Sequence, residues 1–370
     1  MTSLASYLET AAKNGAGMPD ARSEEYRYSR IIQGLHDMSI DAEQSVKKAP
    51  ESPWPSDHVF HDTDHAGLPA CKYSELHPVF RRSSNYFKDL LIAKNDSVLQ
   101  LHLNENKPKL DLTFYAAKQG LNSTKIHIRV SKGQKAALHL HSMAEEGSLL
   151  FPIIFIEAEE ESSLEIFYWP RPGHSKGVLC PWIEAATQAD SQVQLFSFSK
   201  DLAMHRMTFF GYLLGEKSDI SLHTSFYLDK NESSDFFVRI FHESPETTSN
   251  QSINSVALGS SNMNFNGQIA ADKNARQILA YQMFKGLLLD EKAHITARPQ
   301  LDIEYFDLAC SHGVSIGGFT EEELFYLQSR GLKDKEIYPL LTYGFLSEPF
   351  AEMDKDGQWR TEIKKELSVS

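Results

Sequence analysis

Between about Ser97 and Cys310 the chain alternates apolar and polar residues with a period of two. The alternation is plain in VLQLHL, KIHIRV, AALHLHS, SLEIFYW, VQLFSFS, DISLHTSFYL, FFVRIF and AHITA. Because successive side chains of a β-strand point to opposite faces, each segment is predicted to be a strand with one buried face. No helical pattern separates these strands, which argues against βαβ units.

About a dozen consecutive strands could form a sandwich, a barrel or a coiled solenoid. Short turn-like stretches separate many of them, such as SKGQ, AEEGS, GEKSD and DKNESSD. The Asn-Gly pair that favours antiparallel hairpins occurs once in this region, at Asn266–Gly267, which weakens the antiparallel folds. A β-helix stacks rungs with packed inner faces and needs capped ends. The periodicity alone leaves the choice open.

Helical patterns flank the strand region. In residues 2–45, Leu4, Tyr7, Leu8 and Ala11 follow the i, i+3, i+4, i+7 spacing of one helix face. The stretch 49–78 is rich in Pro, Asp and His, and we predict an irregular linker. We therefore divide the chain into an N-terminal helical region with a linker (1–95), a strand core (96–318) and a C-terminal helical domain with a tail (319–370).

The C-terminal region carries clear helix signals. Thr320 and Glu323 have the spacing of a capping box, and Gly331 suits a left-handed cap at the end of the helix. Asp334 is predicted to cap a second helix, in which Pro339 predicts a kink or a late start. The result is a short helical hairpin directly after the last strand.

Charge and cysteine content exclude several functions. The chain has 37 Lys plus Arg against 50 Asp plus Glu, a net charge of −13, and no local basic patch, so nucleic acid is not an expected partner. Cys71, Cys180 and Cys310 form no CxxC pair, which favours a reducing compartment and is too few for a cluster held by this chain alone. The first residues resemble no targeting peptide, and no apolar segment could span a membrane. We therefore expect a cytoplasmic protein.

The segment CSHG (310–313) is the first candidate site. On a strand, Cys310 and His312 share a face about 6–7 Å apart, so a thiolate and an imidazole could approach one metal ion or one cluster edge. Zinc takes about four ligands, and no CxxC or HxxxH follows to complete the set. Such a half-set is expected where a partner subunit supplies the other ligands. The alternative is that Cys310 is a small buried apolar residue and His312 an ordinary polar one.

The segment DHVFHDTDH (57–65) is a second candidate. His58, His61 and His65, with the aspartates between them, could bind zinc or iron in a metal-dependent hydrolase. The alternative is a solvated loop, because a Pro-rich linker would not fix the ligand geometry. A β-helix enzyme acting on carbohydrate is a third class, but it needs clustered carboxylates in a groove.

Isolated residues on the strands have simpler interpretations. Cys180 is predicted to be a core or turn thiol. The strand histidines are predicted to be outward-facing polar positions, namely His102, His127, His139 and His141.

The segment from Ser261 to Leu332 resembles the C-terminal half of the SufB/SufD family of iron–sulfur cluster assembly proteins. The matching features, in order, are Phe265–Gly267 on one strand, Ala275 and Gln277 on the next, Leu287–Asp290, Pro299–Ile303, Cys310–Gly313, Gly317 and Glu323–Gly331. The chain resembles the SufD branch, because it is short, lacks the N-terminal cysteine cluster of many SufB chains and carries the CSHG form of the motif. It departs from the family at 306–309 and directly after Gly313.

The resemblance implies a right-handed parallel β-helix flanked by N-terminal and C-terminal helical regions. It implies a SufB-like partner bound through the β-helix and a SufC ATPase bound through the C-terminal helices. His312 would be the ligand that this chain contributes to a transient iron or iron–sulfur cluster at the SufB interface, and Cys310 would line the same interface. No cofactor would be tightly bound in the isolated chain, and homodimerisation of that chain is left open.

The resemblance also places the ATPase on the C-terminal hairpin, at Phe325, Tyr326, Arg330 and Gly331. Closure of the ATPase on ATP would pull this hairpin and distort the interface. We expect the apolar residues of the hairpin to be mainly core, with exposed neighbours such as Arg330 in contact with SufC; the apolar set is Phe325, Tyr326, Leu327 and Leu340. No Walker motif occurs, so any ATP hydrolysis is expected in another subunit. The resemblance implies that this chain is a scaffold and not an enzyme.

Overall fold

The computed structural model describes residues 2–3, 39–40, 58–60, 68–83, 86–170, 177–303, 308–351 and 357–367. Most of the predicted N-terminal helical region lies outside these residues. Its described parts are two short strands, β1 (Thr2–Ser3) and β2 (Ser39–Ile40), which pair antiparallel. At these four residues the helical prediction is wrong, because the backbone pairs with a segment distant in sequence and not with its own next turn.

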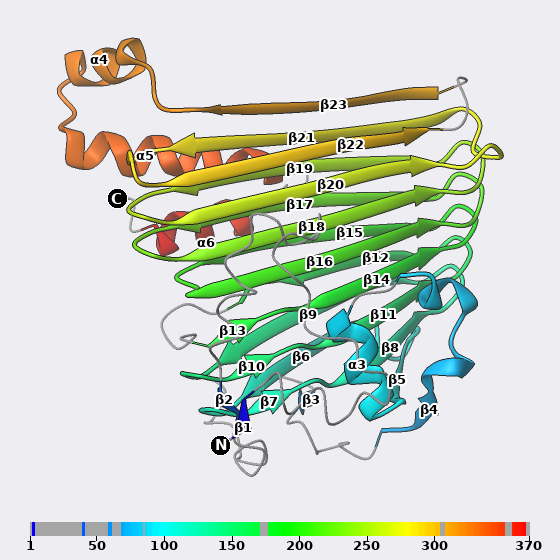
Figure 1. The fold of residues 1–370 in the computed structure, drawn as a ribbon. Coiled ribbons are helices and arrows are strands. Elements are labelled where there is room, and N and C mark those ends of the chain that lie inside the picture. Colours follow the sequence, from blue (N-terminus) through cyan, green and yellow to red (C-terminus); the bar gives the residue numbers. More distant parts are fainter. Residues whose placement is uncertain are drawn as a thin grey trace.

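Two long sheets run along the molecule and enclose the main apolar core between them (Figure 1). In spatial order, the first contains β22 (His294–Ile303), β20 (Asn262–Ala271), β18 (Ser233–His242), β16 (Met204–Leu213), β14 (Trp182–Thr187), β11 (Ile153–Ala158), β8 (Lys125–Val130), β5 (Ser97–Leu103) and β4 (Ala70–Lys72), with β7 (Leu121–Asn122), β10 (Leu149–Leu150) and β13 (Val178–Leu179) beside this path. The second contains β23 (Leu308–Gly317), β21 (Ile278–Leu288), β19 (Thr248–Ala257), β17 (Asp219–Leu228), β15 (Gln192–Lys200), β12 (Ser163–Tyr168), β9 (Lys135–Ala144), β6 (Lys109–Ala116) and β3 (His58–Phe60).

Successive strands pass alternately to one sheet and then to the other, so the chain winds into a parallel β-helix of about 7 turns. Among the described residues, every strand pair in the two sheets is parallel except β4 with β5. Asn266–Gly267 lies inside β20 and forms no hairpin. The predicted β-helix is confirmed. The matched residues Ala275 and Gln277, expected on a strand, instead lie in the turn before β21, and Gln277 has a positive φ of 55°.

The core of the β-helix consists of in-register columns of apolar side chains. One column of the second sheet runs through Leu138, Ile166, Leu195 and Leu222, each of them fully buried. Burial of one such side chain contributes roughly 1.5–3 kcal/mol, and the columns repeat at every rung. We call the interior enclosed by the two sheets the lumen. The alternation in the sequence therefore reflects residues that face the lumen in turn with residues that face outward.

A repeated turn of four residues joins a strand of the first sheet to the next strand of the second sheet. Its third residue has a positive φ, as at Glu161, Asp190, Lys217 and Glu246. The fourth residue is a serine or threonine whose hydroxyl donates to the carbonyl of the first residue, over 2.6–3.0 Å; these residues are Ser162, Ser191, Ser218 and Thr247. In the first three of these turns the same carbonyl also accepts the backbone amide of the serine, so the hydroxyl adds a second hydrogen bond that closes the turn.

The segment before β5 covers the outer face of the first sheet with β4, η2 (Tyr73–Glu75), η3 (Pro78–Arg81) and α3 (Tyr86–Lys94). Together with β3, these elements show that the prediction of an irregular linker over 49–78 is wrong where the chain is described. The apolar residues of the segment pack on the sheet: Phe80 lies 5.3 Å from Phe155, and Phe87 lies 6.4 Å from Phe151, between ring centroids.

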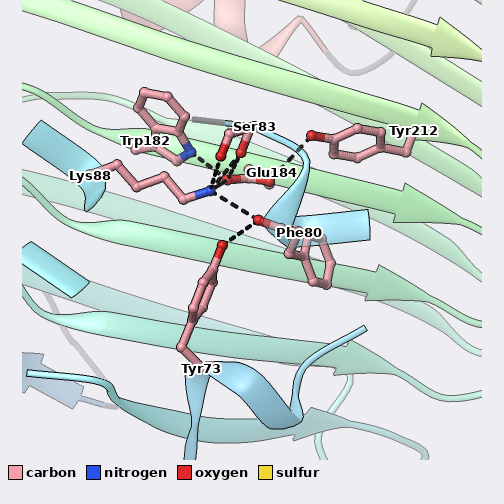
Figure 2. Close-up of polar contacts among 7 residues, drawn as sticks. All are labelled: Tyr73, Phe80, Ser83, Lys88, Trp182, Glu184 and Tyr212. Carbon is pink, nitrogen blue, oxygen red and sulfur yellow. Dashed lines mark hydrogen bonds and ion pairs between the residues drawn. The ribbon is translucent and has the colours of Figure 1, made fainter. Parts of the chain in front are cut away.

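A buried ion pair fastens this segment to the sheet (Figure 2). Lys88 on α3 contacts Glu184 on β14, and neither side chain is exposed. The Lys88 ammonium also donates to the carbonyl of Phe80 at 3.0 Å and to the hydroxyl of Ser83 at 2.5 Å. Glu184 accepts from Ser83 at 2.6 Å and from the indole of Trp182 at 2.7 Å. Burial lowers the pKa of Lys88 and raises that of Glu184, so each group depends on the other for its charge.

The C-terminal helices are α4 (Glu321–Ser329), α5 (Asp334–Ser347), η4 (Glu348–Phe350) and α6 (Gln358–Glu366). The predicted capping box is confirmed: the Thr320 hydroxyl accepts from the Glu323 amide at 3.2 Å, and Glu323 accepts from the Thr320 amide at 2.8 Å. Gly331 has the expected left-handed φ of 91°. No described helix is both long and apolar enough to cross a bilayer.

Two details of the second helix differ from the prediction. Lys333, and not Asp334, is the N-cap, and Asp334 is the first helical residue. The Asp334 carboxylate instead accepts a hydrogen bond from the side-chain amide of Gln328 on α4, at 2.9 Å. The helix also begins well before Pro339, so the alternative of a late start is wrong.

A histidine inside the lumen should make stability depend on pH. His205 on β16 is fully buried, and no described residue forms a hydrogen bond with either of its ring nitrogens. Burial lowers the pKa of His205 to about 3, against about 6.5 for an unfolded chain. The unfolded state therefore binds a proton that the folded state excludes, and stability falls as pH drops from about 6.5 towards 3.

We expect His205→Leu to lose less stability than the wild type between pH 7 and pH 4.5. Chemical denaturation at both pH values measures this, with His102→Leu as the control because His102 is an exposed strand histidine. Equal pH dependence in the wild type and His205→Leu would contradict the assignment.

Candidate functional site

Cys310 and His312 lie on β23, the last strand of the second sheet (Figure 1). β23 pairs with β21 in a parallel register that sets Ala280 opposite Cys310 and Gln282 opposite His312. In the described chain, β23 has no strand on its other side, and β22 ends the first sheet in the same way. The two candidate ligands therefore belong to the terminal rung of the β-helix.

Both side chains belong to lumen-facing columns, and they differ in exposure. Ala280 and Gln282 beneath them are buried, while His312 in the terminal rung is exposed. Cys310 is half-buried and packs in a small apolar cluster with Ile278 and Ala271. Burial raises the pKa of the Cys310 thiol, which favours the neutral form in this chain alone.

The terminal rung offers an incomplete set of donors. Cys310 and His312 bring one sulfur and one imidazole, the donor types that iron and iron–sulfur clusters take. Within the described residues, no group of three or more His, Cys, Asp or Glu side chains could hold a metal ion. The two residues can therefore contribute to a shared site.

Apolar side chains surround these donors on the last rungs. Two apolar residues follow His312 on β23, each at a lumen-facing position: Val314 is 42% exposed and Ile316 is 39% exposed. On the outer face of β21, three large residues are each more than 40% exposed: Leu279, Tyr281 and Met283. This exposed apolar surface was not predicted. The alternation of apolar residues in β23 continues through Val314 and Ile316 and could have indicated it.

The helical hairpin presents a second exposed surface. Phe325 is 71% exposed and Tyr326 is 56% exposed, and the guanidinium of Arg330 lies 5.2 Å from the Tyr326 ring centroid. Leu340 on α5 is exposed as well. The expectation that these apolar residues are mainly core is wrong for Phe325, Tyr326 and Leu340, because the described chain folds nothing over this end of the hairpin; Leu327 is half-buried.

The other end of the hairpin is held firmly to the β-helix. Strand side chains donate to the last carbonyls of α5 and η4: Asn254 to Phe345 at 2.6 Å and Ser225 to Leu346 at 2.7 Å, while His223 Nδ1 lies 2.8 Å from the Pro349 oxygen. Lys285 on β21 forms an ion pair with Glu348. The α5–η4 end of the hairpin is therefore joined to β21, the neighbour of the strand that carries His312.

The tail helix α6 strengthens this attachment. Trp359 stacks on Phe167 of β12 and on Trp169 just after this strand, with ring centroids 5.0 and 5.2 Å apart. Ile363 is fully buried in the same cluster. From the sequence this region was assigned only to the C-terminal tail, without a helix of its own.

The second candidate metal site is described only in part. His58 begins β3, which pairs with β6, so this residue belongs to a strand and not to an irregular loop. His61 and His65 lie outside the described residues. The hydrolase alternative therefore stays a prediction from sequence.

The strand histidines prove less uniform than predicted. His102 is exposed, and His139 is partly exposed beside Asp111 at 3.3 Å. His127 and His141 face outward but are buried, because other parts of the chain cover this surface. The His127 ring lies 6.2 Å from Phe80, and its Nε2 lies 3.3 Å from Glu157. Cys180 is buried as predicted, and burial raises its pKa to about 12.

Comparisons with known proteins agree with the resemblance seen in the sequence. The model of the SufBD core domain, from the SUF system of iron–sulfur cluster assembly, matches residues 114–345. SufD of Escherichia coli is 29% identical over 136 residues, which cover 37% of this chain and 32% of the relative. The chloroplastic protein ABCI7 of Arabidopsis thaliana is 27% identical over 199 residues, 53% of this chain and 42% of the relative. SufD of Bacillus subtilis is 35% identical over 103 residues, 28% of this chain and 22% of the relative. Each match spans less than half of the relative's length.

Proposed function

The chain belongs to the SufBD family of iron–sulfur cluster assembly proteins, and we propose that it is a SufD-like, non-catalytic scaffold subunit. In this proposal it supports cluster assembly at an interface with a SufB-like subunit and binds a SufC-type ATPase through its C-terminal hairpin. The observation that carries the proposal is the exposed His312 on a terminal rung that no described strand covers.

The terminal rung has the properties of a pairing surface. β23 is a ten-residue edge strand, LACSHGVSIG, without a charged residue or proline. Proteins usually protect a long exposed edge with charge, proline or a cover, because its free backbone groups invite another strand. A SufB-like subunit that adds its own strand here would satisfy those groups and bury Val314 and Ile316.

The same docking would complete the ligand set. The nascent cluster is the cargo of the complex, and His312 would hold iron through a neutral ring nitrogen while the partner supplies the other ligands. Cys310, a protonated thiol in the isolated chain, would lose its proton more readily beside a metal. The stacked strands below fix both residues on a rigid base.

The C-terminal hairpin would be the surface to which the ATPase binds. Phe325 and Tyr326 offer the aromatic area that commonly anchors an interface, and Arg330 adds charge beside them. ATP-driven movement of the ATPase would act on α4, pass through α5 to Glu348 and Lys285, and so reach the last rungs.

Co-purification tests both partnerships. The tagged chain, expressed with SufB-type and SufC-type subunits, should retain both. Phe325→Glu should lose the ATPase, because a charge replaces the central aromatic contact, while the SufB-like subunit remains and the unfolding midpoint is unchanged.

Glu322→Ala, an exposed change on the same helix, is the matched control and should retain both partners. Failure of the wild-type chain to retain either subunit would refute the proposal. Retention of the ATPase by Phe325→Glu would remove only the assignment of the hairpin.

A further inference from the structure

One lumen column changes character in the last three rungs. It runs through aliphatic residues up to Leu222 and then continues as Gln251 on β19, Gln282 on β21 and His312 on β23. Gln251 is 0% exposed and Gln282 is 1% exposed. Buried amides are costly in an apolar lumen, so their presence directly beneath an exposed histidine calls for a reason.

The amide of Gln282 is half satisfied. Its Nε2 donates to Oε1 of Gln251 at 2.6 Å, while its Oε1 is buried and receives no hydrogen bond in the described structure. A buried acceptor left unpaired costs about 1–3 kcal/mol. Since the nitrogen and oxygen of an amide diverge from the same carbon, Oε1 does not point to the Gln251 oxygen that holds Nε2. His312 in the terminal rung is the next residue of the same column.

The opposite sheet leaves space for this amide. Gly267 on β20 has no side chain, and a Cβ at this position would lie 2.4 Å from Gln282 Nε2 and 2.7 Å from its amide carbon. The glycine therefore permits a glutamine to extend into the lumen one rung below the candidate ligand.

We propose that Gln282 is a positioning residue for His312. The Gln282 Oε1 accepts the N–H of one imidazole nitrogen, which fixes one tautomer and leaves the other nitrogen free to bind iron. The exposed His312 side chain, which forms no hydrogen bond among the described residues, rotates over Gln282 to make this contact. A second partner that orients the ring is a common requirement of metal-binding histidines. The inference rests on the function proposed above for His312.

Nitrogen NMR of the full chain, labelled with ¹⁵N-histidine, tests the contact. The His312 signals are identified by their loss in His312→Ala. At a pH where the ring is neutral, a single tautomer gives two widely separated ring-nitrogen shifts, whereas a mixture of tautomers draws them together. The wild type should show the wide separation, and Gln282→Met, which keeps the side-chain length but removes the acceptor, should lose it.

Two further variants separate positioning from packing. Leu222→Met disturbs the same column two rungs below Gln282 without touching its hydrogen bond to Gln251, and it should keep the wide separation. Gln282→Glu retains an acceptor and should keep it as well, which covers the case in which Gln282→Met folds poorly. The proposal is wrong if Gln282→Met keeps the wild-type separation, as it would if water filled Oε1, or if Leu222→Met loses it too. Because no cluster is involved, these outcomes are distinct from failure of cluster assembly.

Discussion

His312→Ala is expected to abolish iron–sulfur cluster maturation in cells while leaving the complex with its partner subunits intact. The exposed ring adds little to folding, so its removal should leave the unfolding midpoint unchanged. Its loss would deprive the shared site of a ligand that the described chain cannot replace, since no other group of potential ligands is gathered there. The activity of a cluster-dependent enzyme in a strain that relies on this system is the measurement.

His294→Ala provides the matched control. His294 is also an exposed histidine on a terminal strand, but it lies at the start of β22, away from the CSHG segment. This variant should mature clusters normally. Normal maturation with His312→Ala would remove the ligand assignment, and loss of the whole complex would show that the residue acts in assembly and not as a ligand.

Lys88→Met is expected to destabilise the fold by about 3–5 kcal/mol, because it leaves Glu184 buried without its counter-charge. The double variant Lys88→Met/Glu184→Gln should regain most of this loss. The glutamine is neutral, and its amide oxygen can still accept from Trp182 and Ser83. Chemical denaturation of the wild type, both single variants and the double variant measures the coupling.

Lys132→Met is the control for loss of a lysine as such. Lys132 forms an ion pair with Glu160 at the surface, where both side chains are largely exposed, and its replacement should leave the midpoint unchanged. A Lys88→Met variant as stable as the wild type would show that the pair does not fasten the N-terminal segment to the sheet.

Much of the β-helix could be predicted from the sequence, because the period-two alternation is a direct imprint of lumen-facing and outward-facing positions. The alternation does not specify which strands pair, and that choice required the resemblance to a family. The repeated turn was the missed signal: a serine or threonine recurs at the fourth position in EEES, QADS, GEKS and SPET, once per turn of the β-helix. Such a repeat would have favoured a solenoid on physical grounds alone.

The errors have a common cause, which is that local pattern does not specify what covers a surface. Phe325 and Tyr326 fall at positions that a helix normally buries, yet no described segment packs over them. His127 lies at an outward strand position, yet Phe80, distant in sequence, lies against it. The pair Lys88–Glu184 depends on how α3 docks on the first sheet, and the column Gln251–Gln282–His312 depends on strand register, so neither follows from local pattern.

The central claim is that His312 supplies a nitrogen ligand to a cluster shared with a partner subunit. Pulsed electron paramagnetic resonance tests it in the assembled complex, with only this chain labelled by ¹⁵N-histidine and the cluster reduced to a paramagnetic state. The wild-type complex should show a hyperfine coupling between a labelled histidine nitrogen and the cluster. This coupling should disappear in His312→Ala. A cluster-loaded wild-type complex without that coupling, or a coupling that persists in His312→Ala, would contradict it.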